Sequence, residues 1–87
     1  MARFELRFKP SVAKDLRGLP KPQVRRILAR IDALRDEPRP AGCEKLTAQE
    51  LYRVRQGVYR IVYAIDDSRV IVEVVKVGHR RDVYRTA

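Results

Sequence analysis

The second half of the chain holds three consecutive stretches of mostly apolar residues, separated by short polar segments. The three stretches span residues 51–55, 58–65 and 70–77 and are rich in valine, isoleucine and tyrosine, which are enriched in β-strands. Gln56-Gly57 separates the first two stretches and the polar residues 66–69 separate the last two, and both sequences are typical of tight turns. The pattern predicts three consecutive antiparallel strands.

A turn at Gln56-Gly57 places Arg55 opposite Val58 and sorts the strand residues into two faces, because opposed residues share a face and successive residues alternate. With Ile65 opposite Val70 across the second turn, the first face is apolar and is predicted to form the core: Tyr52, Val54, Tyr59, Ile61, Tyr63, Ile65, Val70, Val72 and Val74. The second face is predicted to hold Arg53, Arg55 and Arg60 together with Val58, Val62, Ile71, Glu73, Val75 and Val77.

Three arginines gathered on one face repel one another. Like charges opposed across a ladder destabilise a sheet by up to ~1 kcal/mol per pair. Glu73 is one carboxylate against three guanidinium groups, so it relieves only part of the repulsion. The arrangement indicates an anionic ligand; the alternative is a solvated face on which the arginine stems cover apolar residues.

The first half of the chain predicts one strand and two helices. Residues 2–8 alternate as a half-buried strand, a short helix follows from Pro10 to Gly18, and a longer one runs from Pro22 to about Asp36. The longer helix carries one apolar stripe: Val24, Ile27, Leu28, Ile31 and Leu34. We therefore predict an α+β domain spanning residues 1–87, with a helical hairpin packed on one face of a mostly antiparallel four-stranded sheet in the order β-α-α-β-β-β.

Composition narrows the classes of partner. The chain has 20 Lys+Arg against 11 Asp+Glu, a net charge of +9, and 15 of its 20 basic residues are arginine, whose planar fork binds phosphate. Such a charge predicts a polyanionic partner. Cys43 and His79 are the only residues of their types, so the sequence predicts neither a disulfide nor a metal site. A signal peptide and an apolar run of ~20 residues are both missing, which predicts a soluble, cytoplasmic protein without a membrane partner.

Three sequence fragments together carry a family resemblance. EKL, YRVRQGVYRIVY and the valine-rich strand ending VKVGHRRDVY resemble the RelE/ParE superfamily of type II toxins, and most closely its RelE branch, over essentially all 87 residues. The resemblance implies a ribosome-dependent mRNA endonuclease that needs no metal or cofactor. In such toxins the 2′-hydroxyl of a messenger in the ribosomal A site attacks the adjacent phosphate, and an acidic RelB-like antitoxin silences the toxin.

The same resemblance implies roles for residues of this chain. By position it makes Arg60, Arg80 and Tyr84 catalytic, and it assigns RNA contacts to Arg53, Arg55, Lys45 and Arg81. Arg60 and Arg80 would stabilise charge on the phosphoryl oxygens, for which one preorganised donor supplies ~3 kcal/mol. Tyr84 would stack on a base or hydrogen-bond the RNA backbone, or else simply pack on the sheet edge.

The chain departs from the family pattern at the residue that would accept a proton. Arg53 and Arg55 stand where the best-known branch has lysines, and arginine stays protonated above pH ~12. We expect His79 to lie among Arg80, Arg81 and Arg53, where positive charge favours its neutral form and lets it accept the 2′-hydroxyl proton. A structural role for His79 at the strand end is the alternative.

Two other functions stay open at this point. A ParE-type toxin has the same fold and binds DNA gyrase without hydrolytic residues, and the missing lysines favour it. A degenerate toxin that only binds its antitoxin is the third reading.

Overall fold

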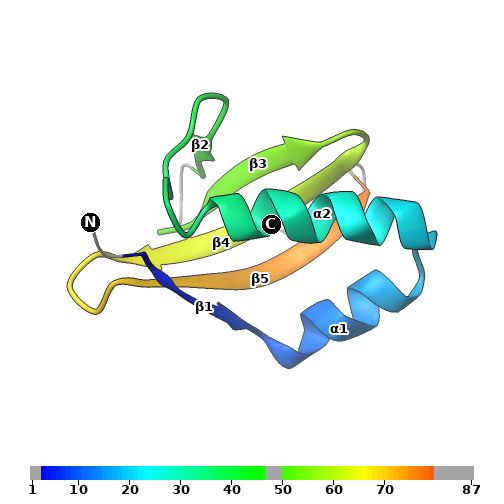
Figure 1. Cartoon of the computed structure of the whole chain (residues 1–87), viewed down its shortest axis with the longest axis horizontal. Helices are drawn as coiled ribbons and strands as arrows, with labels where there is room; N and C mark the ends of the chain where they lie inside the picture. The colour runs from blue at the N-terminus through cyan, green and yellow to red at the C-terminus, as the bar shows by residue number, and fades with distance from the viewer. Residues whose placement is uncertain (1–2, 47–49, 80–87) are drawn as a thin grey trace.

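The computed structural model of the chain describes residues 3–46 and 50–79. Within these ranges the strands are β1 (Glu5–Phe8), β2 (Glu44–Lys45), β3 (Tyr52–Gln56), β4 (Tyr59–Asp66) and β5 (Ile71–His79), and the helices are α1 (Pro10–Arg17) and α2 (Lys21–Ala33). The described strands form one sheet in the order β1-β5-β4-β3-β2, in which β1 runs parallel to β5 and all other neighbours are antiparallel. Both helices pack against the same side of this sheet (Figure 1).

The predicted α+β fold with a helical hairpin on a mostly antiparallel sheet is confirmed, with one strand more than expected. The addition is β2, which pairs with β3 through Glu44 opposite Arg53 and Lys45 opposite Tyr52. A strand of two residues is too short to leave an alternating pattern in the sequence. Residues 37–44, the connector after α2, show no periodicity from which a strand could be predicted.

Proline and short-range hydrogen bonds set the limits of the helices. Pro10 lies in the first turn of α1, where its missing N–H costs nothing, and Gly18 follows the last residue. The second helix ends at Ala33 rather than near Asp36, because the next residues switch to tighter bonds between residues three apart. Leu34 N–H donates to Ile31 at 3.0 Å and Asp36 N–H donates to Ala33 at 3.3 Å.

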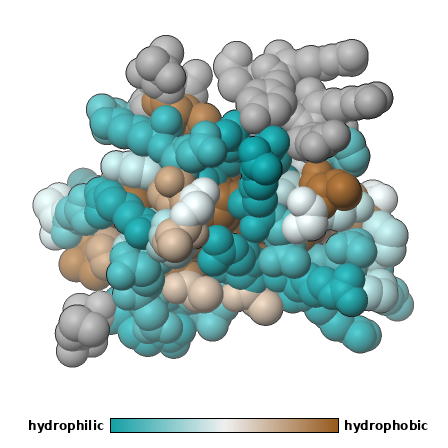
Figure 2. Space-filling view, turned by 90° about the horizontal axis from the view of Figure 1, so that it is seen from above, coloured by the Kyte–Doolittle hydropathy of each residue, from teal (hydrophilic) through white to brown (hydrophobic). Residues whose placement is uncertain are grey.

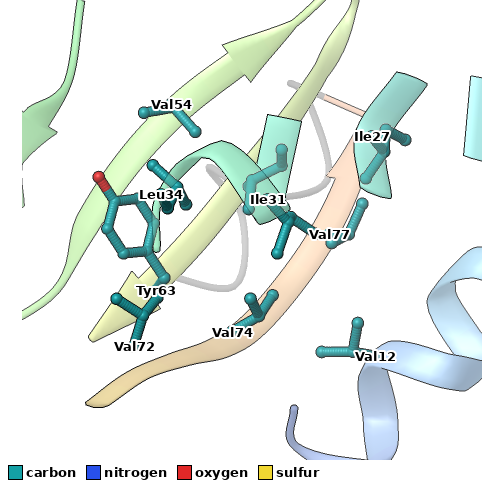
Figure 3. Packing of buried hydrophobic residues seen from close by; sticks show 10 residues of the cluster. Val12, Ile27, Ile31, Leu34, Val54, Tyr63, Val72, Val74 and Val77 are labelled. Carbon is teal, nitrogen blue, oxygen red and sulfur yellow. The ribbon is translucent and has the colours of Figure 1, made fainter. Parts of the chain in front are cut away.

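The predicted core is confirmed except for Val70, which lies in a turn, and one further valine joins it. Side chains from both helices and three strands are buried together (Figure 3): Val12, Ile27, Ile31, Leu34, Val54, Ile61, Tyr63, Val72, Val74 and Val77. Tyr52, Tyr59 and Ile65, also predicted, pack against this cluster and are partly buried. Leu28 was expected to face inward but is 40% exposed. Ile27, Ile31 and Leu34 face the core, and Leu28, the residue after Ile27, therefore points to the side of the helix.

The predicted pairing of β3 with β4 was wrong by two residues, although the predicted faces are right. The turn is Gly57-Val58, so Arg55 pairs with Arg60 instead of Val58. Gly57 adopts a φ of +61°, which glycine tolerates and which suits the first position of such a turn. Because side chains repeat every second residue, a shift of two leaves every side chain on its predicted face.

The pairing of β4 with β5 changes the predicted faces near its end. Ile65 pairs with Val72 rather than Val70, which lies in the turn. A bulge between Val62 and Tyr63 then shifts the register by one residue, so Val77 pairs with Ile61. A shift of one residue moves a side chain to the other face, which explains why Val77 is 2% exposed in the core although it was predicted on the arginine side.

Candidate functional site

The face of the sheet turned away from the core carries the three predicted strand arginines. Arg55 and Arg60 are directly opposed across β3 and β4, and Arg53 lies opposite Val62. We call the surface defined by Arg53, Arg55 and Arg60 the arginine face, and the surface defined by Val54, Ile61, Tyr63, Val72, Val74 and Val77 the core face. The sequence therefore predicted the gathering of these arginines correctly.

Burial separates the three arginines. Arg55 is exposed, whereas Arg60 is only 4% exposed and Arg53 only 7%. We expected Arg60 to be exposed, and this expectation was wrong: β4 is a central strand, so neighbouring strands flank Arg60 on both sides. Removing a charge from water costs several kcal/mol, which the surrounding structure has to offset.

The carboxylate that partly neutralises the arginine face is Glu44, not Glu73. Glu44 forms an ion pair with Arg53 across the β2–β3 pair, and the Arg53 side chain is 8% exposed against 59% for Glu44. Glu73 instead pairs with Arg7 and Ala64, toward the other end of the sheet. Sequence reasoning missed Glu44 because β2 has only two residues, too few for a periodicity that would assign Glu44 to a face.

His79 lies on the other side of the sheet from the arginine face. It pairs with Tyr59, its ring meets the Tyr59 ring edge-on at 6.3 Å between centroids, and Tyr59 packs against the core. Arg60 pairs with the preceding residue, Gly78, and so lies on the opposite face. The expected closeness of His79 to Arg53 is therefore not found.

The remaining predicted site residues fall into two groups. Lys45 pairs with Tyr52, which places it on the core side of the sheet, and its ammonium lies 3.4 Å from a Glu50 carboxylate oxygen. Arg80, Arg81 and Tyr84 lie outside the described residues. The structure thus brings together Arg53, Arg55 and Arg60 and does not bring Lys45 or His79 to them.

A polar cluster fixes the connector before β2 to the end of the sheet. Arg39 binds Asp67 through two hydrogen bonds of 3.2 and 2.8 Å, and its guanidinium lies 5.1 Å from the centre of the Tyr52 ring. The buried Tyr63 hydroxyl donates to the Pro38 carbonyl at 2.6 Å and lies 3.2 Å from Cys43 Sγ. Burial raises the pKa of Tyr63 well above its usual value, so the hydroxyl stays protonated at neutral pH.

The described part of the chain offers neither a cluster of metal ligands nor a helix that could span a membrane. Residues 3–46 and 50–79 hold no group of three or more His, Cys, Asp or Glu placed to bind a metal ion. Neither described helix is long and apolar enough to cross a membrane. Hydrophilic residues cover most of the side drawn in Figure 2, with apolar patches between them.

Comparison with known proteins agrees with this architecture. Residues 6–84 match the family described as the ParE toxin of the type II toxin-antitoxin system, parDE. Toxin RelG of Mycobacterium tuberculosis is 36% identical over 90 residues, covering 94% of this chain and 97% of RelG.

Solved structures give the same answer. The archaeal RelE–RelB complex from Pyrococcus horikoshii OT3 contains a chain with a TM-score of 0.80 and 31% identity, covering 90% of this chain and 96% of that one. A mutant of Escherichia coli toxin RelE in the free state has a TM-score of 0.77 and 28% identity, covering 98% and 93%. The chain belongs to the RelE/ParE superfamily of type II toxins, on its RelE branch.

Proposed function

We propose that this toxin is a ribosome-dependent endonuclease that cleaves messenger RNA in the ribosomal A site and is silenced by a RelB-like antitoxin. The observation that carries the proposal is the direct opposition of Arg55 and Arg60 on the arginine face. Arg55 is exposed to meet a phosphate, while Arg60 is held nearly buried beside it. Two opposed guanidinium groups suit a phosphate, because each presents a planar fork of donors.

In this proposal the reaction is a transesterification within the RNA. The 2′-oxygen forms a bond to the adjacent phosphorus, and the bond from phosphorus to the 5′-oxygen breaks, leaving a 2′,3′-cyclic phosphate and a 5′-hydroxyl. Arg60 and Arg80 stabilise the negative charge that builds on the phosphoryl oxygens, and Tyr84 orients the RNA by stacking or hydrogen bonding. The wider RNA-binding set consists of Arg53, Arg55, Lys45 and Arg81. The ion pair between Arg53 and Glu44 reduces the contribution of Arg53 to RNA binding.

Proton transfer is the part of the mechanism that needs its own test. His79 is the proposed acceptor of the 2′-hydroxyl proton, and RNA reaches it only at the end of the β4–β5 ladder, because its ring lies beside Tyr59. If His79 is the base, His79→Ala lowers the cleavage rate by ~10²–10⁴ and removes the loss of activity on acidification. A normal rate and pH profile would mean that orientation and charge alone drive the reaction.

The experiment that tests the proposed function is primer extension on a messenger incubated with ribosomes and the purified toxin. We expect cuts within codons that appear only when ribosomes are present. The second candidate, gyrase binding, is favoured by arginine in place of lysine at Arg53 and Arg55. Uncut messenger together with trapped gyrase–DNA complexes would establish that candidate instead.

An apolar groove between the helices supports the antitoxin part of the proposal. Phe8 and Leu28 are 42% and 40% exposed, and they line a groove of about 360 Å³ with Lys9, Pro10, Val12, Ala13 and Leu16. We also expected the antitoxin to contact apolar residues on the other side of the sheet, namely Val58, Val62, Ile71 and Val75. Of these, Val58 is 53% exposed, whereas Val62 is only 5% exposed. An acidic amphipathic segment would match both the apolar lining of the groove and the +9 charge.

Binding to the acidic protein encoded beside the toxin tests this assignment. We expect affinity to weaken as salt rises and to persist at high salt, because salt screens charges but leaves apolar burial intact. Leu28→Asp should weaken binding while cleavage by the free toxin stays normal, and Ala29→Asp, an equal change of charge at an exposed position of the same helix, is the matched control. Binding that ignores both salt and Leu28→Asp would contradict the assignment.

A further inference from the structure

The outer edge of β5 changes partner halfway along the strand. Its first half pairs with β1, and this pairing ends at Phe8 opposite Val74, where Lys9 N–H donates to the Val74 carbonyl at 2.9 Å. The chain then turns into α1 at Pro10. Within the described ranges, β1 therefore leaves the part of β5 beyond Val74 without a strand on this edge.

Asp15 of α1 contacts β5 beyond the point where the pairing with β1 ends. One of its carboxylate oxygens accepts a hydrogen bond from Val77 N–H at 3.2 Å, and the other lies 3.8 Å from Lys76 Nζ. The Asp15 side chain is 19% exposed, whereas Asp32 and Asp36 on and after α2 are 59% and 62% exposed. Asp15 is thus set against the strand, unlike the surface carboxylates that pair in solvent.

The Asp15 contact lies just beyond the β-bulge. The bulge shifts the pairing of β4 with β5 so that Val77 enters the core and Gly78 comes opposite Arg60. Val77 N–H donates to Asp15 at the edge of the sheet, while the Val77 side chain packs in the core and Val77 pairs with Ile61. A slip of one residue would reverse these faces and remove Gly78 from Arg60.

From this geometry we infer that Asp15 is a positioning residue: by holding Val77 N–H it fixes the end of β5 in the bulged register that places Gly78 beside Arg60. The inferred effect on cleavage rests on the proposed ribonuclease function. Asp15 lies on α1 and acts through the strand rather than on RNA. Its loss should therefore lower kcat and leave KM unchanged, because binding by the exposed Arg55 is retained.

The test combines cleavage kinetics on ribosomes with amide hydrogen exchange of the free toxin. In Asp15→Ala we expect faster exchange at Val77 and His79 and a fall in kcat of about 10²-fold, the size that small misplacements at a reacting centre produce. Asp15→Asn keeps an oxygen that can accept from Val77 N–H and should restore most of both properties. Asp32→Ala removes an exposed carboxylate from α2 and should change neither.

Alanine is the best helix former, so α1 should survive the substitution, and Asp15→Ser gives a second test if the alanine variant unfolds. Unchanged exchange at Val77 in a folded Asp15 variant would overturn the inferred contact. Faster exchange with normal kcat would overturn the positioning role. If the unmodified toxin leaves ribosome-bound messenger intact, the proposed function fails, and the exchange result alone then decides whether Asp15 holds the strand.

Discussion

Arg60 and Ile61 are neighbours in β4 and are both almost fully buried, 4% and 0% exposed, but they lie on opposite faces of the sheet. Ile61 contacts an apolar cluster, and burying a side chain of this kind contributes about 1.5–3 kcal/mol to folding. Arg60 lies opposite another arginine, and removing its charge from water costs free energy. The core face therefore carries the stability of the fold, while the arginine face keeps a buried charge at a cost in free energy.

The sharpest way to separate the two faces is to replace Arg60 and keep its volume. Arg60→Met retains an unbranched stem in the buried site but removes the guanidinium, so we expect cleavage on ribosomes to fall by about 10²–10³-fold. The thermal midpoint should stay near that of the unmodified toxin or rise. Arg26→Met, an exposed arginine on α2, is the control and should cleave normally. Normal cleavage by Arg60→Met would remove Arg60 from the mechanism.

On the core face the same kind of change should act on stability. Ile61→Ala leaves a cavity between the sheet and α2, and we expect a loss of about 2–5 kcal/mol in the free energy of unfolding. Val58 lies in the turn between β3 and β4 and is 53% exposed, so Val58→Ala should change this free energy by less than about 0.5 kcal/mol. Denaturant unfolding of both variants measures the difference. Equal effects would mean that the core is placed wrongly.

Tyr63 combines an apolar position in the core with one polar atom. Tyr63→Phe leaves the buried Pro38 carbonyl without the hydroxyl that donates to it at 2.6 Å, and we expect a loss of about 1–3 kcal/mol. Because burial raises the pKa of Tyr63, its contribution is present below the unfolded pKa of about 10 and is lost as pH rises further. Unfolding curves across alkaline pH should fall steeply for the unmodified toxin and less steeply for Tyr63→Phe.

The smallest expected effect concerns the exposed rim of the core face. Hydrogen bonding from Arg39 holds the pKa of Asp67 below its usual range. The contribution of a carboxylate with a lowered pKa is present above its unfolded pKa of about 3.9 and is lost as pH falls through the folded value. Asp67→Asn should therefore be slightly less stable than the unmodified toxin at neutral pH, and the two should converge on acidification. A difference that widens in acid would contradict this assignment.

The sequence by itself determined most of the core and the face on which arginine gathers. Side-chain alternation is a local property of a strand. Ile61 and Arg60 were therefore assigned to opposite faces correctly, even though the turn was predicted one residue too early in the chain. The helical stripe likewise predicted the burial of Ile27 and Ile31. The family resemblance followed from residues spread along the chain, and the match over residues 6–84 confirms it.

Only the tertiary structure decided what depends on contacts between distant residues. The bulge moved Val77 into the core and separated His79 from the arginine face, and no local sequence pattern marks it. Arg60 is buried on the central strand β4, and Arg53 is neutralised by Glu44 of the two-residue strand β2, nine residues away. Asp15 meets Val77 across 62 residues of chain. Periodicity describes one element at a time, whereas register, burial and ion pairing are set by how the elements pack together.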